Sequence, residues 1–161
     1  MSLDARHSKQ SITLKKLATA QTLSGLGVTG TFAAGSLLVV QITGSEALAG
    51  LVQTSTVVGA ALLALPLARW TDQGGRRRSL GFGYFLGALG ASFAFIGGVQ
   101  KIFPLILIGA AMIGGASAAG YQARFAAVDL SDDSHRARDL SMVVWASTIG
   151  SVLGPNLMDP A

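Results

Sequence analysis

Cysteine is absent from the 161-residue chain, and charged residues make up only 12% of it. Without cysteine the chain can form no disulfide, no thiolate zinc site and no thiol-dependent catalytic centre. The scarcity of charge excludes more, because an ordinary soluble domain carries about a quarter charged residues and needs them on its water-facing surface. Half of the residues are hydrophobic. We therefore expect a lipid bilayer to cover most of the folded chain.

Residue patterns typical of enzymes are also lacking. His7 and His135 are isolated, and no serine elbow, phosphate loop or pair of inward-facing carboxylates is found. Residues 25–30 fit the pattern G-x-G-x-x-G, but a dinucleotide fingerprint needs a preceding strand, and residues 17–24 are predicted to be helical. The sequence thus predicts no enzymatic activity, no metal site and no cofactor.

Long apolar runs are the main positive feature. A helix needs about twenty apolar residues to cross the hydrocarbon core, and these runs lack the period-two alternation of barrel strands. We predict an all-α membrane protein with a bundle of about five transmembrane helices. A polar, cytoplasmic amino-terminal segment, residues 1–16, precedes a transmembrane domain over 17–161, with spans at about 17–43, 47–68, 80–99, 102–128 and 140–158.

Every basic residue except Lys101 lies before the first run or near alternate connections between the runs, and the net charge is +4. By the positive-inside rule they mark the cytoplasmic side. This predicts a multi-pass protein of the cell membrane with a cytoplasmic amino terminus. Because the basic residues form no face with interleaved aromatics, we expect no nucleic-acid partner. The three basic groups are Arg6, Lys9, Lys15 and Lys16; Arg69 and Arg76 to Arg78; and Arg124, Arg136 and Arg138.

The connection between the second and third spans carries a motif. A glycine suits a tight turn, and an acid among arginines can form switchable ion pairs. A general positive-inside loop would explain the arginines but not the acid or the glycine. The segment resembles the signature of the major facilitator superfamily, G-x-x-x-D-(R/K)-x-G-R-(R/K), although Ala68 and Gln73 depart from it. The matching residues are Asp72, Gly75, Arg76 and Arg77.

Asp129 follows the fourth span, where members of this superfamily often carry an acid that pairs with the arginine of the signature. The resemblance implies that Asp72, Arg76 and Asp129 form a charge relay that holds one conformation of the bundle. The alternative is that Asp129 merely caps or solvates a helix end, because carboxylates are common in loops.

The fifth span contains Gly150, Gly154 and Pro155, which resemble the G-x-x-x-G-P element of proton-coupled drug antiporters in the same superfamily. Proline removes a backbone donor and bends a helix, while glycines permit close helix contacts. A packing kink in any membrane helix explains Pro155 equally well. Many such antiporters also have an arginine within the fourth span, near the position of Ala110, and this chain has none there. Arg124 lies about four turns further along, so we do not transfer a proton-coupling role to it.

The resemblance implies a secondary transporter of small molecules that works by alternating access, with protons as a candidate coupling ion and efflux as a candidate direction. Members of the superfamily have twelve spans, so we expect the chain to be an amino-terminal part that ends in or after the fifth helix. Its missing partner would be the carboxy-terminal half. Polar residues inside spans are candidates to line the substrate cavity: Gln21, Thr29, Gln53, Tyr121 and Gln122.

Two other classes of protein remain open. One is a non-transporting membrane scaffold or assembly partner, which would tolerate mutation of Asp72 and Arg76. The other is a lipid-modifying membrane enzyme, which would need buried acids or bases that face each other. The charged residues found here lie only at the ends of spans.

Overall fold

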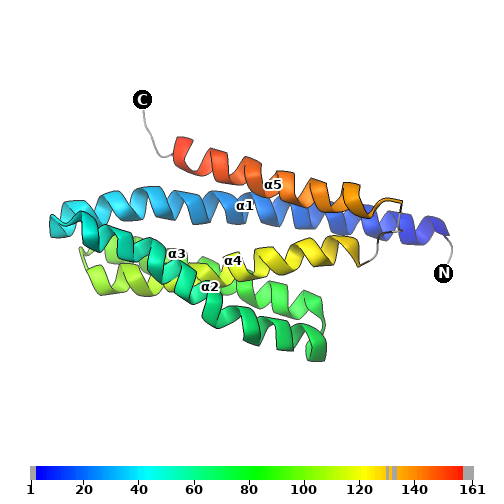
Figure 1. Ribbon diagram of the computed structural model, residues 1–161, viewed down its shortest axis with the longest axis horizontal. Coiled ribbons are helices and arrows are strands. Elements are labelled where there is room, and N and C mark those ends of the chain that lie inside the picture. Colours follow the sequence, from blue (N-terminus) through cyan, green and yellow to red (C-terminus); the bar gives the residue numbers. More distant parts are fainter. Residues whose placement is uncertain (1–2, 130, 132–133, 158–161) are drawn as a thin grey trace.

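The computed structural model describes residues 3–129, 131 and 134–157, with side chains from residue 10 onward. Within these residues the chain forms helices and no strands. The helices are α1 (Leu3–Thr43), α2 (Glu46–Gly74), α3 (Arg76–Val99), α4 (Phe103–Val128) and α5 (Arg136–Asn156). They pack side by side as an elongated bundle (Figure 1). The predicted all-α membrane bundle is confirmed.

Four helices of the described part are long and apolar enough to cross a membrane, namely α1 from Gln10, α2, α3 and α4. The fifth helix, α5, has 21 residues and does not reach the same apolar character. It lies along α1 and runs in the same direction (Figure 1). The multi-pass character therefore rests on α1 to α4, and the fifth span stays a prediction.

Several helices extend beyond the predicted spans. α1 begins at Leu3, so the polar amino-terminal segment is helical from that residue onward, and α2 continues to Gly74. Only Gly75 separates α2 from α3. A helix satisfies its own backbone hydrogen bonds in water as well as in lipid, so the edge of an apolar run need not end it. Gly75 ends α2 because its φ of 83° is a conformation that glycine adopts without steric cost.

The connection between α1 and α2 is equally short. Gly44 has a φ of 69°, and the hydroxyl of Ser45 accepts a hydrogen bond from the backbone N–H of Leu48 at 3.4 Å. This bond satisfies one of the free donors at the start of α2. The two turns, at Gly44 and at Gly75, lie at opposite ends of the bundle (Figure 1).

Helix α4 is the centre of the bundle and contacts each of the other four helices. Its small residues allow close approach: a Cβ at Gly59 of α2 would overlap the carbonyl oxygen of Ala111, and one at Gly83 of α3 would lie 2.6 Å from the Cβ of Ala119. In a bilayer, helices associate through such tight packing, since lipid offers no hydrophobic driving force between them.

Helix α5 packs against α1 through its two motif glycines. A Cβ at Gly150 would overlap the carbonyl oxygen of Thr22, and one at Gly154 would overlap the hydroxyl of Thr29. Both glycines are buried. The spacing of four residues places them on one face of α5, so they explain why α5 lies so close along α1.

Candidate functional site

The chain gathers its predicted charge motif at one end of the bundle. The start of α1, the junction of α2 and α3, and the connection from α4 to α5 all lie at this end (Figure 1). Alternating helix direction produces this arrangement, because every second connection returns to the same side. Hereafter this end is called the basic end.

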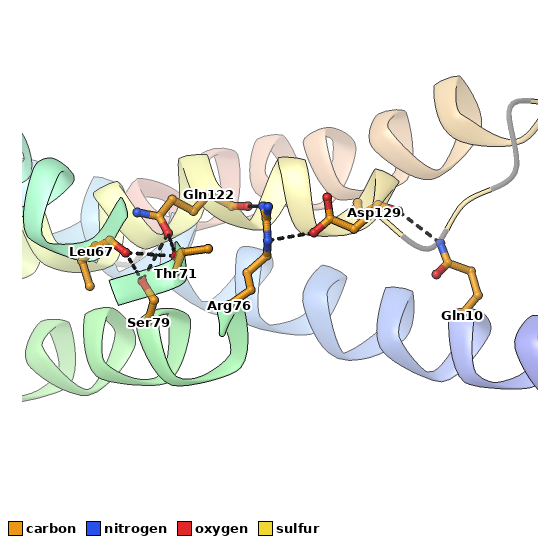
Figure 2. Close-up of polar contacts among 8 residues, drawn as sticks. Gln10, Leu67, Thr71, Arg76, Ser79, Gln122 and Asp129 are labelled. Carbon is orange, nitrogen blue, oxygen red and sulfur yellow. Dashed lines mark hydrogen bonds and ion pairs between the residues drawn. The ribbon is translucent and has the colours of Figure 1, made fainter. Parts of the chain in front are cut away.

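At the basic end, Arg76 at the start of α3 forms an ion pair with Asp129, which follows the last residue of α4 (Figure 2). The Nε of Arg76 lies 2.8 Å from Oδ2 of Asp129. One terminal nitrogen of the same guanidinium donates to the backbone carbonyl of Gln122 at 3.3 Å. Two of the residues predicted to form the charge relay are therefore in contact.

A hydrogen-bond network continues from this pair into the bundle (Figure 2). The side-chain oxygen of Gln122 accepts from the hydroxyl of Thr71 at 2.8 Å and lies 3.2 Å from the hydroxyl of Ser79. Ser79 is buried and donates to the carbonyl of Leu67 at 2.6 Å. Gln122 thus connects the ends of α2, α3 and α4, and its predicted role in lining a cavity stays a prediction.

The remaining residues of the motif lie outside this network. Asp72 and Arg77 are both exposed at the basic end, and Asp72 forms no ion pair within the described part of the chain. Gly75 supplies the turn that brings α3 back beside α2. The structure thus joins Arg76 to Asp129 and leaves Asp72 facing outward, one turn before Arg76.

A second polar cluster at the basic end was missed by the sequence analysis. The side-chain nitrogen of Gln10 in α1 donates to Oδ2 of Asp139 at 2.8 Å and to the hydroxyl of Ser131 at 2.7 Å. Ser131 in turn donates to Asp139 at 2.5 Å. Asp139 is buried, with 7% of its surface exposed. The only signal in the sequence was an acid in the first turn of α5, a common position for helix-stabilising acids.

The other candidate cavity residues have varied surroundings. Gln21 is buried: its amide nitrogen donates to the carbonyl of Gly120 at 3.3 Å, and its oxygen accepts from the hydroxyl of Tyr84 at 2.9 Å. Thr29 donates to the carbonyl of Gly25 in its own helix. Gln53 is exposed on α2, and Tyr121 is exposed on α4.

Pro155 lies in the last turn of α5 and is exposed, so the predicted kink stays a prediction. For the residues described, no three His, Asp or Glu side chains gather in a group that would hold a metal ion.

Comparison with known proteins agrees with this arrangement. The family model of the Major Facilitator Superfamily matches residues 17–158. The chain is 33% identical over 147 residues to the uncharacterized MFS-type transporter YddS of Bacillus subtilis (strain 168), and 31% identical over 147 residues to the uncharacterized MFS-type transporter YdeG of the same organism. Each alignment covers 91% of this chain and 34% of the relative. No solved structure matches the chain significantly.

The chain spans about a third of the length of the curated relatives it matches. The range matched by the family model, residues 17–158, contains the junction of α2 and α3, Asp129 and the glycines of α5. On this evidence, the chain belongs to the major facilitator superfamily.

Proposed function

We propose that this helical unit serves in a secondary transporter, which moves a small molecule across a membrane by alternating access. Membership of the superfamily supports this proposal, as do the four apolar helices and the transporter names of both relatives. Membership of the superfamily also favours a transporter over an enzyme. The observation that carries the mechanism is the ion pair between Arg76 and Asp129 at the basic end.

The pair has the strength that a reversible contact needs. The side chains of Arg76 and Asp129 are 29% and 47% exposed, so water weakens their attraction. Exposed ion pairs contribute about 0.5–1 kcal/mol, which biases two conformations by about two- to fivefold without locking either. In our proposal the pair favours one conformation of the basic end and breaks during each transport cycle.

Asp72 is the second acceptor in this relay. It lies on the last turn of α2, close in sequence to Arg76, and it is exposed with no ion pair in the described conformation. We assign to Asp72 the role of holding Arg76 in the alternative conformation. Arg77 and Gly75 support the exchange, Arg77 by its charge at the same end and Gly75 by the tight turn.

The finer form of the proposal is proton-coupled efflux from the cytoplasm, across the cell membrane, with the amino terminus inside. The resemblance of Gly150, Gly154 and Pro155 to the antiporter element supports proton coupling, and the basic end supports the orientation. The test uses everted vesicles energised with a pH gradient, in which export from the cytoplasm is measured as uptake of the probe into the vesicle. Loss of export on addition of a protonophore is the expected result, while export that persists would exclude protons.

The transport proposal is tested by flux in vesicles that contain a protein of the relatives' length with this unit. A cationic probe, ethidium, and an anionic probe, carboxyfluorescein, cover both charge classes. We expect Asp72→Asn and Asp129→Asn to lower flux severalfold while membrane insertion is unchanged. Glu46→Gln is the matched control, because it removes an exposed carboxylate at the opposite end of the bundle.

Flux that is equal in all three variants would contradict the relay. A protein that inserts and associates with partners but moves neither probe, and shows no change of conformation, would favour the membrane scaffold instead. Change of conformation is measured by the reaction of single introduced cysteines with a membrane-impermeant maleimide from each side. The absence of native cysteine makes each introduced thiol the only one in this unit.

A further inference from the structure

A polar recess of about 130 Å³ lies between α1, α4 and α5. Hydroxyl, amide and guanidinium groups line it, which is unusual for the membrane-embedded part of a bundle. Its polar side chains come from all three helices: Gln21, Ser24, Ser117, Arg124, Ser147 and Ser151. Arg124 lies near the end of α4 that belongs to the basic end, about 6 Å along the helix axis from Val128.

Arg124 has no counter-ion in the described structure. Its guanidinium carbon lies 5.4 Å from the ring centroid of Tyr121, and its Nε is buried without a hydrogen-bond partner. No carboxylate pairs with it among the side chains described from residue 10 onward. An arginine keeps its charge in proteins, and an unpaired charge at the level of a membrane span is costly. Contact with Tyr121 offsets only a small part of this cost.

The recess does not suit a surface that faces lipid. Unsatisfied polar groups in the hydrocarbon core cost several kcal/mol each, so polar side chains within spans face protein or a water-filled cavity. Large apolar side chains are exposed on all five helices, for example Leu62 and Phe85 on α2 and α3, and Phe125 and Trp145 on α4 and α5, so the recess is a polar interruption of an otherwise apolar surface. By this argument the recess faces water or protein and not lipid.

We propose that Arg124 and this recess bind the carboxylate of a small, singly charged anionic cargo. This inference rests on the transporter proposal, because the bound anion is a cargo only if the protein transports it. A guanidinium binds a carboxylate through two parallel hydrogen bonds; the Nε of Arg124 is buried, so the terminal nitrogens of its guanidinium are the donors proposed to face the recess. Ser151 lines the same recess and offers a hydroxyl donor, whereas the hydroxyl of Ser147 donates to the carbonyl of Val144 at 2.7 Å.

The charge balance favours a single negative charge. One arginine lines the recess, and no other basic residue does, so a doubly charged phosphate would bring one uncompensated negative charge into it. The ring of Tyr121 and the side chain of Val28 supply an apolar wall for the body of the cargo. A small aromatic or branched monocarboxylate fits this combination of charge, size and wall.

The test uses charge-selective labelling of a thiol in the recess. Ser147→Cys places the only cysteine of the membrane-embedded chain beside Arg124 in the lining. The thiol is treated with an anionic reagent, 2-sulfonatoethyl methanethiosulfonate, and separately with a cationic one, 2-(trimethylammonium)ethyl methanethiosulfonate. The rate of each reaction is divided by the rate at which the same reagent reacts with a free thiol. We expect the anionic reagent to react about tenfold faster on this scale, because the unpaired charge attracts it. Benzoate should slow its reaction, and the neutral isostere benzamide should not.

Arg124→Gln should abolish both the preference and the protection by benzoate. Arg138→Gln is the matched control, because it removes an arginine that is exposed at the basic end and lies outside the recess, and it should keep both. The proposal would be overturned by equal normalised rates for the two reagents, or by a preference that survives Arg124→Gln. It would also be overturned if benzoate gave no protection, or if benzoate and benzamide protected equally. Labelling needs no transport, so this result is independent of the flux assay that tests the transporter proposal.

Discussion

Arg76 and Asp129 join the start of α3 to the end of α4 through an Nε to Oδ2 distance of 2.8 Å, although both side chains remain partly exposed. The short distance between Nε and Oδ2 defines an ion pair, and the exposure of both side chains to water weakens its attraction. Its function in our proposal depends on this combination, because a contact that breaks in every cycle must cost little to break.

The first prediction concerns the strength of this pair. A double-mutant cycle with Arg76→Gln and Asp129→Asn should give a coupling free energy of unfolding of about 0.5–1 kcal/mol, since the pair is exposed. The measurement is unfolding of the membrane-embedded chain in mixed micelles at increasing denaturing detergent. Coupling indistinguishable from zero would contradict the pair, and coupling above about 3 kcal/mol, the range of buried pairs, would contradict its easy reversal.

The second prediction concerns the contact between α2 and α4. Gly59→Ala should destabilise the bundle by about 1–3 kcal/mol, because the new Cβ would overlap the carbonyl oxygen of Ala111 and force the helices apart. Gly50→Ala, on the same helix, is the control, since a Cβ there would meet nothing within 4 Å. The same detergent unfolding measures both. Equal stability of the two variants would be evidence against this packing.

The third prediction concerns the buried cluster of Gln10, Ser131 and Asp139. Asp139→Leu should remove the carboxylate that accepts from Gln10 and Ser131, which both keep the carbonyl of Ala127 as an acceptor, and cost about 1.5–3 kcal/mol, the typical contribution of hydrogen bonds to a charged group. The loss should be local, because the cluster fastens the first turns of α1 to α5. Hydrogen exchange of residues 10–16 should therefore become roughly tenfold faster or more.

Asp72→Asn serves as the control for this measurement, since Asp72 is exposed and forms no ion pair in the described structure. Its exchange in residues 10–16 should match that of the unmodified chain. Unchanged exchange in Asp139→Leu would show that the cluster does not hold the start of α1.

The fourth prediction concerns the hydrogen bond between Tyr84 and Gln21. Tyr84→Phe should cost about 0.6 kcal/mol, and at most about 1.7 kcal/mol, which is the range for hydrogen bonds between transmembrane helices. Gln21 stays buried in the variant and keeps its bond to the carbonyl of Gly120. Tyr121→Phe is the control for unfolding, because Tyr121 is exposed and its hydroxyl has no hydrogen bond in the described structure. A larger loss of unfolding free energy in Tyr121→Phe than in Tyr84→Phe would contradict the prediction.

Composition was sufficient to predict the class of fold. Apolar runs of about twenty residues with few charges have only one common outcome in a bilayer, a helix that satisfies its own backbone. The turn at Gly75 was also readable, because glycine adopts a positive φ without steric cost. Helices α1 and α2 continue past the predicted spans, since the edge of an apolar run marks the edge of the membrane and not the end of the helix.

The candidate site was only partly predictable. A motif in the sequence singled out Arg76 and Asp129, which contact each other, but it also singled out Asp72, which faces outward. For Gln122 the cavity role stays a prediction, while its hydrogen bonds with Thr71 and Ser79 could not be read from the sequence. The sequence shows how far along its helix a side chain lies. It does not show which neighbouring helix that side chain faces.

The sequence alone determined that this chain is a bundle of membrane helices with its basic connections at one end, because hydropathy and charge act residue by residue. Only the tertiary structure decided which polar groups meet. Gln10 reaches Asp139, and Arg124 stays unpaired beside Tyr121, because the rotation of each helix about its axis is set by packing against all its neighbours at once. That rotation depends on close contacts such as Gly59 with Ala111, which involve residues far apart in the sequence.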